Sequence, residues 1–206
     1  CPCGSPIDRH GPEEMATAFT YTNRKGRTSH LHRRETRNGK TRYVFAREPG
    51  EGAVEGIPEG YEVRENVNGI VSLARARPRK IGEEEEQAVR SVMARIGLDD
   101  YRVEVKDDAI VVFEPDRSRP ELEEIIRFLG PFGKNRRVMD VLTKGTTYSP
   151  ALRFVLVDEQ ARDFDVERMT YTGEAGWSWP LEQGSIADLA GSFLPHLGKD
   201  SFYELA

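Results

Sequence analysis

Apolar and polar residues alternate in five short runs within the first third of the chain, and turn residues separate the runs. Alternation with a period of two is typical of strands that bury one face. Asn38-Gly39 and Asn68-Gly69 each join two runs, and this dipeptide predicts a two-residue type I′ hairpin turn, in which both residues have positive φ. The sequence therefore predicts a small antiparallel sheet of four or five strands, over residues 20–23, 28–35, 41–47, 61–65 and 70–74.

Helical spacing of apolar residues appears after residue 79. A helix is predicted to begin at each of three start signals, which are the acidic turn at 83–86, Pro120 and Ser185. Strands are predicted between these helices at 101–106, 109–114, 138–147, 152–158, 164–171 and 177–181. The predicted fold class is α+β, with a small antiparallel N-terminal sheet of hairpins followed by an α-β-β-α-β-β-β-β-α antiparallel module.

Composition divides the 206 residues into three parts. Residues 1–14 are rich in Pro, Gly and charge, and Ile7 is their one large aliphatic residue, so they are predicted to form a disordered or dispensable tail. A basic antiparallel β module is predicted at 15–78 and an acidic α+β module at 79–206. Hydrophobic residues make up 37% and charged residues 32% of the chain, which indicates a heavily charged surface.

The charges are distributed unevenly along the chain. Residues 15–80 hold 14 Lys and Arg against 7 Glu, whereas residues 81–206 hold 15 Lys and Arg against 25 Asp and Glu. Such asymmetry indicates contact with nucleic acid or another polyanion. Aromatic residues are interleaved with the N-terminal cations, which suits phosphate contacts combined with base stacking. Nucleic-acid-binding residues are therefore predicted at Arg24, Lys25, Arg27, Arg33, Arg34, Arg37, Lys40, Arg42 and Tyr43.

A second interpretation of these cations needs no ligand. They would solvate one face of the sheet, protect its edge strands from pairing with another chain, or dock onto the acidic C-terminal half. The position of each cation in the folded hairpins separates the two interpretations.

Part of the N-terminal half resembles an uncharacterised bacterial family. The resemblance covers about residues 19–75 and is carried by the runs Tyr21-Thr22-Asn23-Arg24-Lys25-Gly26, Asn38-Gly39-Lys40 and Ile57-Pro58-Glu59-Gly60-Tyr61-Glu62. It implies a bacterial, intracellular origin and supplies no activity, ligand or catalytic residue.

Metal-ligating residue types occur in two places. His30 and His32 are two apart on a predicted strand and so share one face, but a third ligand is not evident from the sequence. Cys1 and Cys3 form half of a zinc motif, with His10 as the nearest further ligand. These patterns are incomplete, and we expect no cofactor and no metal, with His30 and His32 as the weak candidates.

Catalytic motifs are not apparent. Carboxylates gather at Asp158, Glu159, Asp163, Asp165 and Glu167, where we expect solvated loop and strand positions rather than an acid and base pair. The chain has no P-loop, G-x-G-x-x-G or nucleophile elbow, so no catalytic residue is predicted. An enzyme is the less favoured class.

Trp177 and Trp179 alternate on a predicted strand, where they indicate core packing or, if exposed, a surface for a protein partner. We expect a cytoplasmic protein that does not contact a membrane, and the oligomeric state stays open. The favoured function is a non-enzymatic binding or regulatory protein that contacts a polyanion through its basic β module. The alternatives are a small metal-dependent hydrolase using His30 and His32, and a purely structural or self-associating protein.

Overall fold

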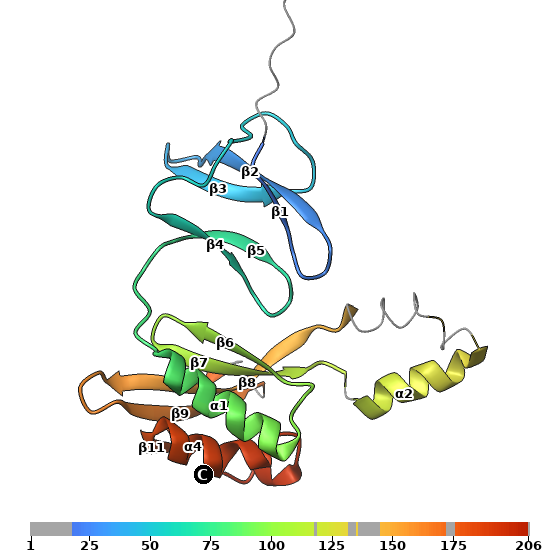
Figure 1. Ribbon diagram of the computed structural model, residues 1–206, viewed down its shortest axis with the longest axis vertical. Helices are drawn as coiled ribbons and strands as arrows, with labels where there is room; N and C mark the ends of the chain where they lie inside the picture. The colour runs from blue at the N-terminus through green and yellow to red at the C-terminus, as the bar shows by residue number, and fades with distance from the viewer. Residues whose placement is uncertain (1–17, 118, 132–134, 136–144, 172–175, 206) are drawn as a thin grey trace, which may run out of the picture. The chain divides into compact units, whose positions relative to one another are not determined.

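The computed structural model describes residues 18–117, 119–131, 135, 145–171 and 176–205. These residues form two compact units. The first unit comprises the described residues up to Arg64 together with Val71–Arg75, and the second comprises Glu65–Ile70 and the described residues from Ala76 onward (Figure 1). The predicted tail, with Cys1, Cys3 and His10, lies outside the described residues.

The first unit contains five strands, at the positions that the alternating pattern predicts. Strands β1, β2 and β3 form an antiparallel sheet in the order β1-β2-β3, and β4 pairs with β5. Their bounds are Thr20–Thr22 for β1, Thr28–Glu35 for β2, Thr41–Ala46 for β3, Tyr61–Glu65 for β4 and Val71–Arg75 for β5.

The expectation of one sheet of four or five strands was wrong, because the five strands form two sheets. The loop between β3 and β4 returns to β2 and takes the place of a further strand. The backbone N–H of Arg33 donates to the carbonyl of Gly52 at 2.7 Å, and that of Val54 donates to the carbonyl of Leu31 at 3.0 Å. These bonds occupy the edge of β2 beyond the short β1, so the β4–β5 hairpin cannot extend the sheet there.

The two Asn-Gly turns are also not the predicted type I′. Glycine alone has positive φ in these turns, since Arg162 is the one described residue other than glycine with positive φ. Thr36 N–H donates to the Lys40 carbonyl and Gly39 N–H donates to the Thr36 carbonyl, at 2.8 and 2.9 Å. This is a three-residue loop with a left-handed glycine in its last position, in which Asn38 keeps negative φ. Asn66–Ile70 repeats the pattern.

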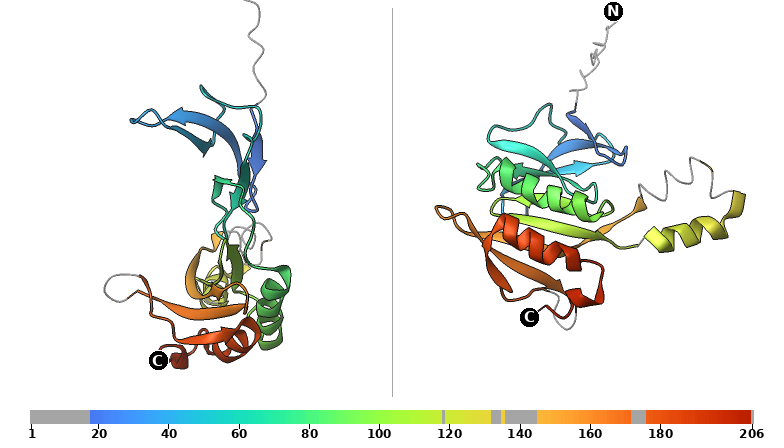
Figure 2. Two further views of the ribbon diagram at one scale, coloured as in Figure 1. Left: turned by 90° about the vertical axis from the view of Figure 1, so that its left-hand side faces the viewer. Right: turned by 60° about the horizontal axis from the view of Figure 1, so that its bottom comes forward.

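The second unit is an antiparallel sheet with helices packed on one face. The strand order is β10-β9-β8-β7-β6, and β11 pairs with β9. Helices α1 and α4 contact each other and lie on the same side of the sheet (Figure 2). The bounds are Glu83–Ile96 for α1, Arg102–Lys106 for β6, Ala109–Pro115 for β7, Arg119–Phe128 for α2, Tyr148–Asp158 for β8, Asp163–Thr170 for β9, Gly176–Trp177 for β10, Glu182–Ser185 for β11 and Ile186–Phe193 for α4.

The core of this unit lies between the sheet and its two helices. Val89 of α1 and Leu189 of α4 pack with Leu152, Phe154 and Phe164, and all five are almost completely buried. Short 3-10 turns after α4, at Leu194–His196 and Asp200–Phe202, add Leu194 and Phe202 to the same cluster.

The helix start signals and most strands are confirmed, and the α+β class with them. Ser185 caps α4, because its hydroxyl accepts a hydrogen bond from the Asp188 N–H. The predicted strand at 138–147 lies largely outside the described residues, and its described end at 145–147 is not in a strand. The polar strand β11 shows no alternation of apolar residues. It forms by backbone pairing with β9. No helix within the described ranges is long and apolar enough to cross a membrane.

Candidate functional site

The eight predicted cations all lie on what we call the basic hairpins, residues 20–46. Three occupy the β1–β2 turn, two lie on β2, two occupy the β2–β3 turn and one lies on β3: Arg24, Lys25 and Arg27; Arg33 and Arg34; Arg37 and Lys40; and Arg42. Seven of them are exposed, and Lys25 is half-buried.

One polar side chain fixes each of the two turns. The buried Asn23 side-chain oxygen accepts hydrogen bonds from the N–H groups of Lys25 and Arg27, at 3.1 and 2.8 Å. In the second turn the Thr36 hydroxyl donates to the Lys40 carbonyl and accepts from the Lys40 N–H, at 3.0 and 3.1 Å. The backbone of each turn is therefore satisfied locally, and the cationic side chains are not needed to hold it.

Strand register distributes the arginines over both faces of the sheet. Residues directly opposite each other on paired strands project from the same face. Arg33 is opposite Tyr43, whereas Arg34 is opposite Arg42 on the other face. Two like charges in directly opposite positions repel each other and destabilise a sheet. The fold thus carries an unfavourable arginine pair in the β2–β3 hairpin.

Ion pairing does not relieve this repulsion. Among the residues that the structure describes, none of the carboxylates forms an ion pair with six of the eight cations. These six, which we call the unpaired cations, are Arg27, Arg33, Arg34, Arg37, Lys40 and Arg42. The first unit has eleven Lys and Arg against six Glu, a net charge of +5.

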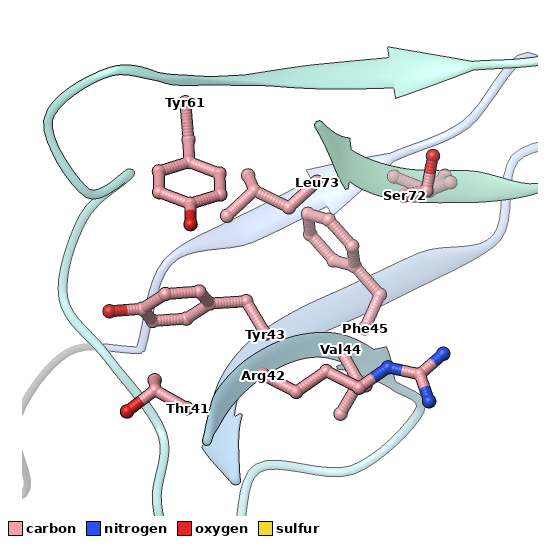
Figure 3. A pocket seen from close by; sticks show the side chains of 9 residues that line it. Thr41, Arg42, Tyr43, Val44, Phe45, Tyr61, Ser72 and Leu73 are labelled. Atoms are coloured by element: carbon pink, nitrogen blue, oxygen red, sulfur yellow. The ribbon is translucent and has the colours of Figure 1, made fainter. Parts of the chain in front are cut away.

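A pocket of about 420 Å³ opens beside these cations in the first unit. We call it the tyrosine pocket. Tyr43 and Tyr61 form an edge-to-face pair with ring centroids 5.6 Å apart, and Phe45 and Leu73 point toward the same space (Figure 3). The residues that line it are Thr41, Arg42, Tyr43, Val44, Phe45, Tyr61, Val71, Ser72 and Leu73.

Sequence reasoning identified Tyr43 and missed Tyr61 as a site residue. Tyr61 begins β4, and its contact with β3 depends on how the β4–β5 hairpin folds back on the first three strands. No local pattern encodes that contact, since the two tyrosines are separated by a loop rich in glycine and proline.

The two candidate metal ligands have other surroundings. His32 is buried, and its Nε2 and Nδ1 lie 3.1 and 3.4 Å from the carbonyl oxygens of Glu48 and Glu51. Either ring nitrogen can donate to its carbonyl oxygen when it carries the proton. The Nδ1 atom of His30 is buried and has no partner within the described part of the chain. In that same part, no three His, Cys, Asp or Glu side chains gather as a metal site would require.

Three of the five clustered carboxylates, Asp158, Glu159 and Glu167, have local structural partners. Asp158 accepts hydrogen bonds from the N–H groups of Gln160 and Ala161, which lower the pKa of its carboxyl. Glu159 binds Lys80 at 2.6 Å, and this contact lowers the pKa of Glu159 and raises that of Lys80. The carboxyl of Glu167 binds Arg153. These acids therefore stabilise turns and strand pairs.

A different carboxyl has a raised pKa. Burial raises the pKa of Glu114, and the neighbouring charge of Asp116 raises it further. The Asp116 carboxylate accepts a hydrogen bond from the Ser149 hydroxyl at 2.6 Å, so this neighbour of Glu114 already has a hydrogen-bond partner. Sequence reasoning did not select Glu114, because its burial depends on packing at the end of β7.

The two tryptophans do not share one surface environment. Trp177 packs against Val67, Val111 and Phe113, and the Arg153 guanidinium lies 4.4 Å from its ring centroid. Trp179 lies beyond β10 and is 89% exposed. A protein contact through Trp179 stays a prediction, and Trp177 is a packing residue.

Comparison with known proteins adds no relative: no family model matches the chain, and no curated protein or solved structure is similar to it. The residues of the site are therefore the basis for a proposed function.

Proposed function

We propose that this chain is a non-enzymatic binding or regulatory protein whose basic hairpins contact a polyanion, and that the polyanion is nucleic acid. The observation that carries the proposal is the cross-strand pair Arg34 and Arg42, with which no carboxylate of the described residues forms an ion pair. Such a pair opposes folding of the hairpin. A phosphate bound by both guanidinium groups would turn the repulsion into a binding site.

A third turn of the same chain serves as an internal comparison. Asn66–Ile70 has the hydrogen bonds of the two basic turns and a left-handed glycine at the same position. Its other positions hold Val67, Asn68 and Ile70; Val67 is buried, and the Asn68 side chain makes hydrogen bonds with the backbone of Tyr148. Turn geometry therefore does not require cations, and the five in the other two turns need a different explanation.

The second interpretation, a solvated face, explains these cations less well. Solvation is achieved by charges of either sign, and mixed signs avoid repulsion. Each basic turn nevertheless contains cations and no carboxylate, and the strands of the β2–β3 hairpin add Arg33, Arg34 and Arg42 against the one carboxylate Glu35. A strong excess of positive charge along a hairpin is the electrostatic feature expected of a phosphate-binding protein.

The test combines binding with stability. Arg34→Gln and Arg42→Gln should each weaken binding to labelled DNA or RNA, measured by fluorescence anisotropy, and should reduce the slope of log affinity against log salt by about 0.7–0.9 per lost phosphate contact. Each should also raise the melting temperature, because the repulsion is removed. Arg75→Gln, which removes an exposed cation of the same unit outside the basic hairpins, is the matched control.

Two results would contradict the proposal. One is the absence of binding to single-stranded or duplex nucleic acid at about 50 mM salt, where phosphate contacts are strong. The other is a loss of affinity in Arg75→Gln as large as that in Arg42→Gln. The first shows that the cations do not bind phosphate, and the second that they act through net charge without a defined site.

A further inference from the structure

We propose that the tyrosine pocket receives an unstacked nucleobase, so that the preferred ligand is a single strand. This inference rests on the proposed function, because it assumes that the basic hairpins contact nucleic acid. It goes beyond that function in assigning the ligand class and in adding Tyr61, Phe45 and Leu73 to the site.

The lining of the pocket suits a flat aromatic ligand. Phe45, Tyr43 and Tyr61 supply three aromatic rings from two strands, and Leu73 adds an aliphatic wall (Figure 3). Nucleobases stack on aromatic rings without regard to sequence, because each base has a π face. The volume of about 420 Å³ lies within the range of small-molecule sites, which is about 300–1,000 Å³.

The two tyrosines also supply polar groups at the pocket. All three rings are half-buried, so part of each is accessible from the pocket. Within the described residues, neither the Tyr43 nor the Tyr61 hydroxyl makes a hydrogen bond. A hydroxyl both donates and accepts, and so it can pair with the edge of a base.

Charge around the pocket distinguishes a base from the other ligands of aromatic sites. Aromatic cages also bind quaternary ammonium groups. Arg33 is opposite Tyr43 and projects from the same sheet face, whereas Arg42 contributes to the lining but its side chain projects from the other face. The charge of Arg33 would repel an ammonium ligand, whereas it can bind a phosphate that flanks a base.

A duplex cannot fill the pocket in the same way. Paired bases are stacked inside the helix, and extracting one requires unstacking and unpairing it. A single strand presents its bases without that requirement. The pocket therefore predicts a preference for single strands over duplex, in addition to the phosphate contacts that both ligands share.

The experiment compares three labelled probes of about twelve nucleotides, within the site sizes of small single-strand modules. They are oligothymidylate, an abasic deoxyribose-phosphate oligomer of the same length, and a duplex. The first two carry the same phosphates and differ in the bases. We expect the full chain to bind oligothymidylate about 5- to 150-fold more tightly than the abasic oligomer, since stacking of one base has about this effect. An RNA probe, oligouridylate, tests whether the 2′-hydroxyl adds affinity.

Variants test whether the preference for oligothymidylate over the abasic oligomer depends on the tyrosine pocket. Tyr43→Leu and Tyr61→Leu should reduce binding of oligothymidylate to the level of the abasic oligomer and leave binding of that oligomer unchanged. Tyr43→Phe should keep most of the preference. Tyr203→Leu, which removes an exposed tyrosine of the second unit, is the matched control. A variant that fails to fold loses both ligands, and in that case Thr41→Trp, which fills the pocket from an exposed position on the strand face of Tyr43, replaces it.

The outcomes separate the two proposals. Equal affinity of the wild-type chain for oligothymidylate and the abasic oligomer overturns the base pocket and leaves the phosphate-binding function intact. A preference that survives both Tyr→Leu variants and Thr41→Trp also overturns it, because the bases then bind elsewhere. Failure to bind any of the probes overturns the proposed function itself.

Discussion

Replacing Arg153 by Met is expected to destabilise the second unit by about 2–3 kcal/mol. Arg153 lies on β8 opposite Glu167 of β9. Its Nε and Nη2 donate to one carboxylate oxygen of Glu167, at 2.9 and 2.5 Å, and its guanidinium stacks on Trp177. Methionine keeps the length of the side chain and removes its charge and its donors.

The magnitude follows from the exposure of the two partners. The Glu167 side chain is 13% exposed and that of Arg153 is 29% exposed. Loss of one partner from a fully buried pair costs about 3–5 kcal/mol, whereas an exposed pair contributes about 0–1 kcal/mol. Without Arg153, Glu167 keeps a nearly buried charge, so the expected loss of stability lies just below the range for a fully buried pair. Glu167→Gln leaves the more exposed Arg153 on the Trp177 ring, and about 1 kcal/mol is expected.

Urea unfolding followed by tryptophan fluorescence measures these differences. Trp177 and Trp179 are the two tryptophans of the chain, and both lie in the second unit, so the signal reports unfolding of that unit. The double variant Arg153→Met/Glu167→Gln should be more stable than Arg153→Met alone, because no unpaired carboxylate remains. The reasoning is refuted if Glu167→Gln destabilises the unit as much as Arg153→Met.

Three further predictions concern backbone strain and pH. Gly52→Ala should lower the melting temperature of the first unit in far-UV circular dichroism, because φ is +84° and a Cβ would lie 2.6 Å from the Arg33 carbonyl oxygen; an unchanged melt would contradict this. Glu114→Gln should raise the melting temperature at pH 7. Below pH 4.5, the ordinary pKa of a Glu carboxyl, the variant and the wild type should have the same melting temperature. The melting temperature rises because a carboxyl whose pKa is raised in the folded state stabilises that state only while it is protonated, and this stabilisation is lost as the pH rises. Arg162→Ala should be less stable than Arg162→Gly in thermal melts: both lose the bond to Glu85, whereas glycine relieves the φ of 57°. Equal melts would show that this strain is negligible.

Local patterns predicted most of the secondary structure, because those patterns have local causes. The strands β2 and β4 have the predicted bounds, since alternating side chains fix which face is buried. Helix α1 has four glutamates in its first turn and ends before the left-handed Gly97. Both signals act within one helical turn and need no knowledge of the rest of the fold.

Contacts between distant segments were not predictable in this way. The type I′ turn was the wrong choice at Asn38-Gly39, because the Thr36 side chain and backbone favour a longer loop. The tyrosine pocket depends on β3 meeting the β4–β5 hairpin, and the sequence contains no signal for that contact. The site could therefore be predicted as a set of cations, without the aromatic pocket beside them.

The uneven charge along the chain has different causes in its two units. In the second unit four of the acids have cationic partners of the same unit: Glu85 binds Arg162, Glu86 binds Arg90, and Glu159 and Glu167 bind Lys80 and Arg153. The charges of these four acids are therefore neutralised within their own unit.

The basic surplus of the first unit has no such local use. Its unpaired cations form no ion pair with a described carboxylate, and the two turns that carry three of them are held by Asn23 and Thr36. Because the whole chain has a net charge of -5, its long-range field does not attract a polyanion. Attraction must arise within about one Debye length of the basic hairpins, roughly 10 Å at 0.1 M salt. The geometry of these few side chains, rather than the overall charge of the protein, thus determines both the affinity and its dependence on salt.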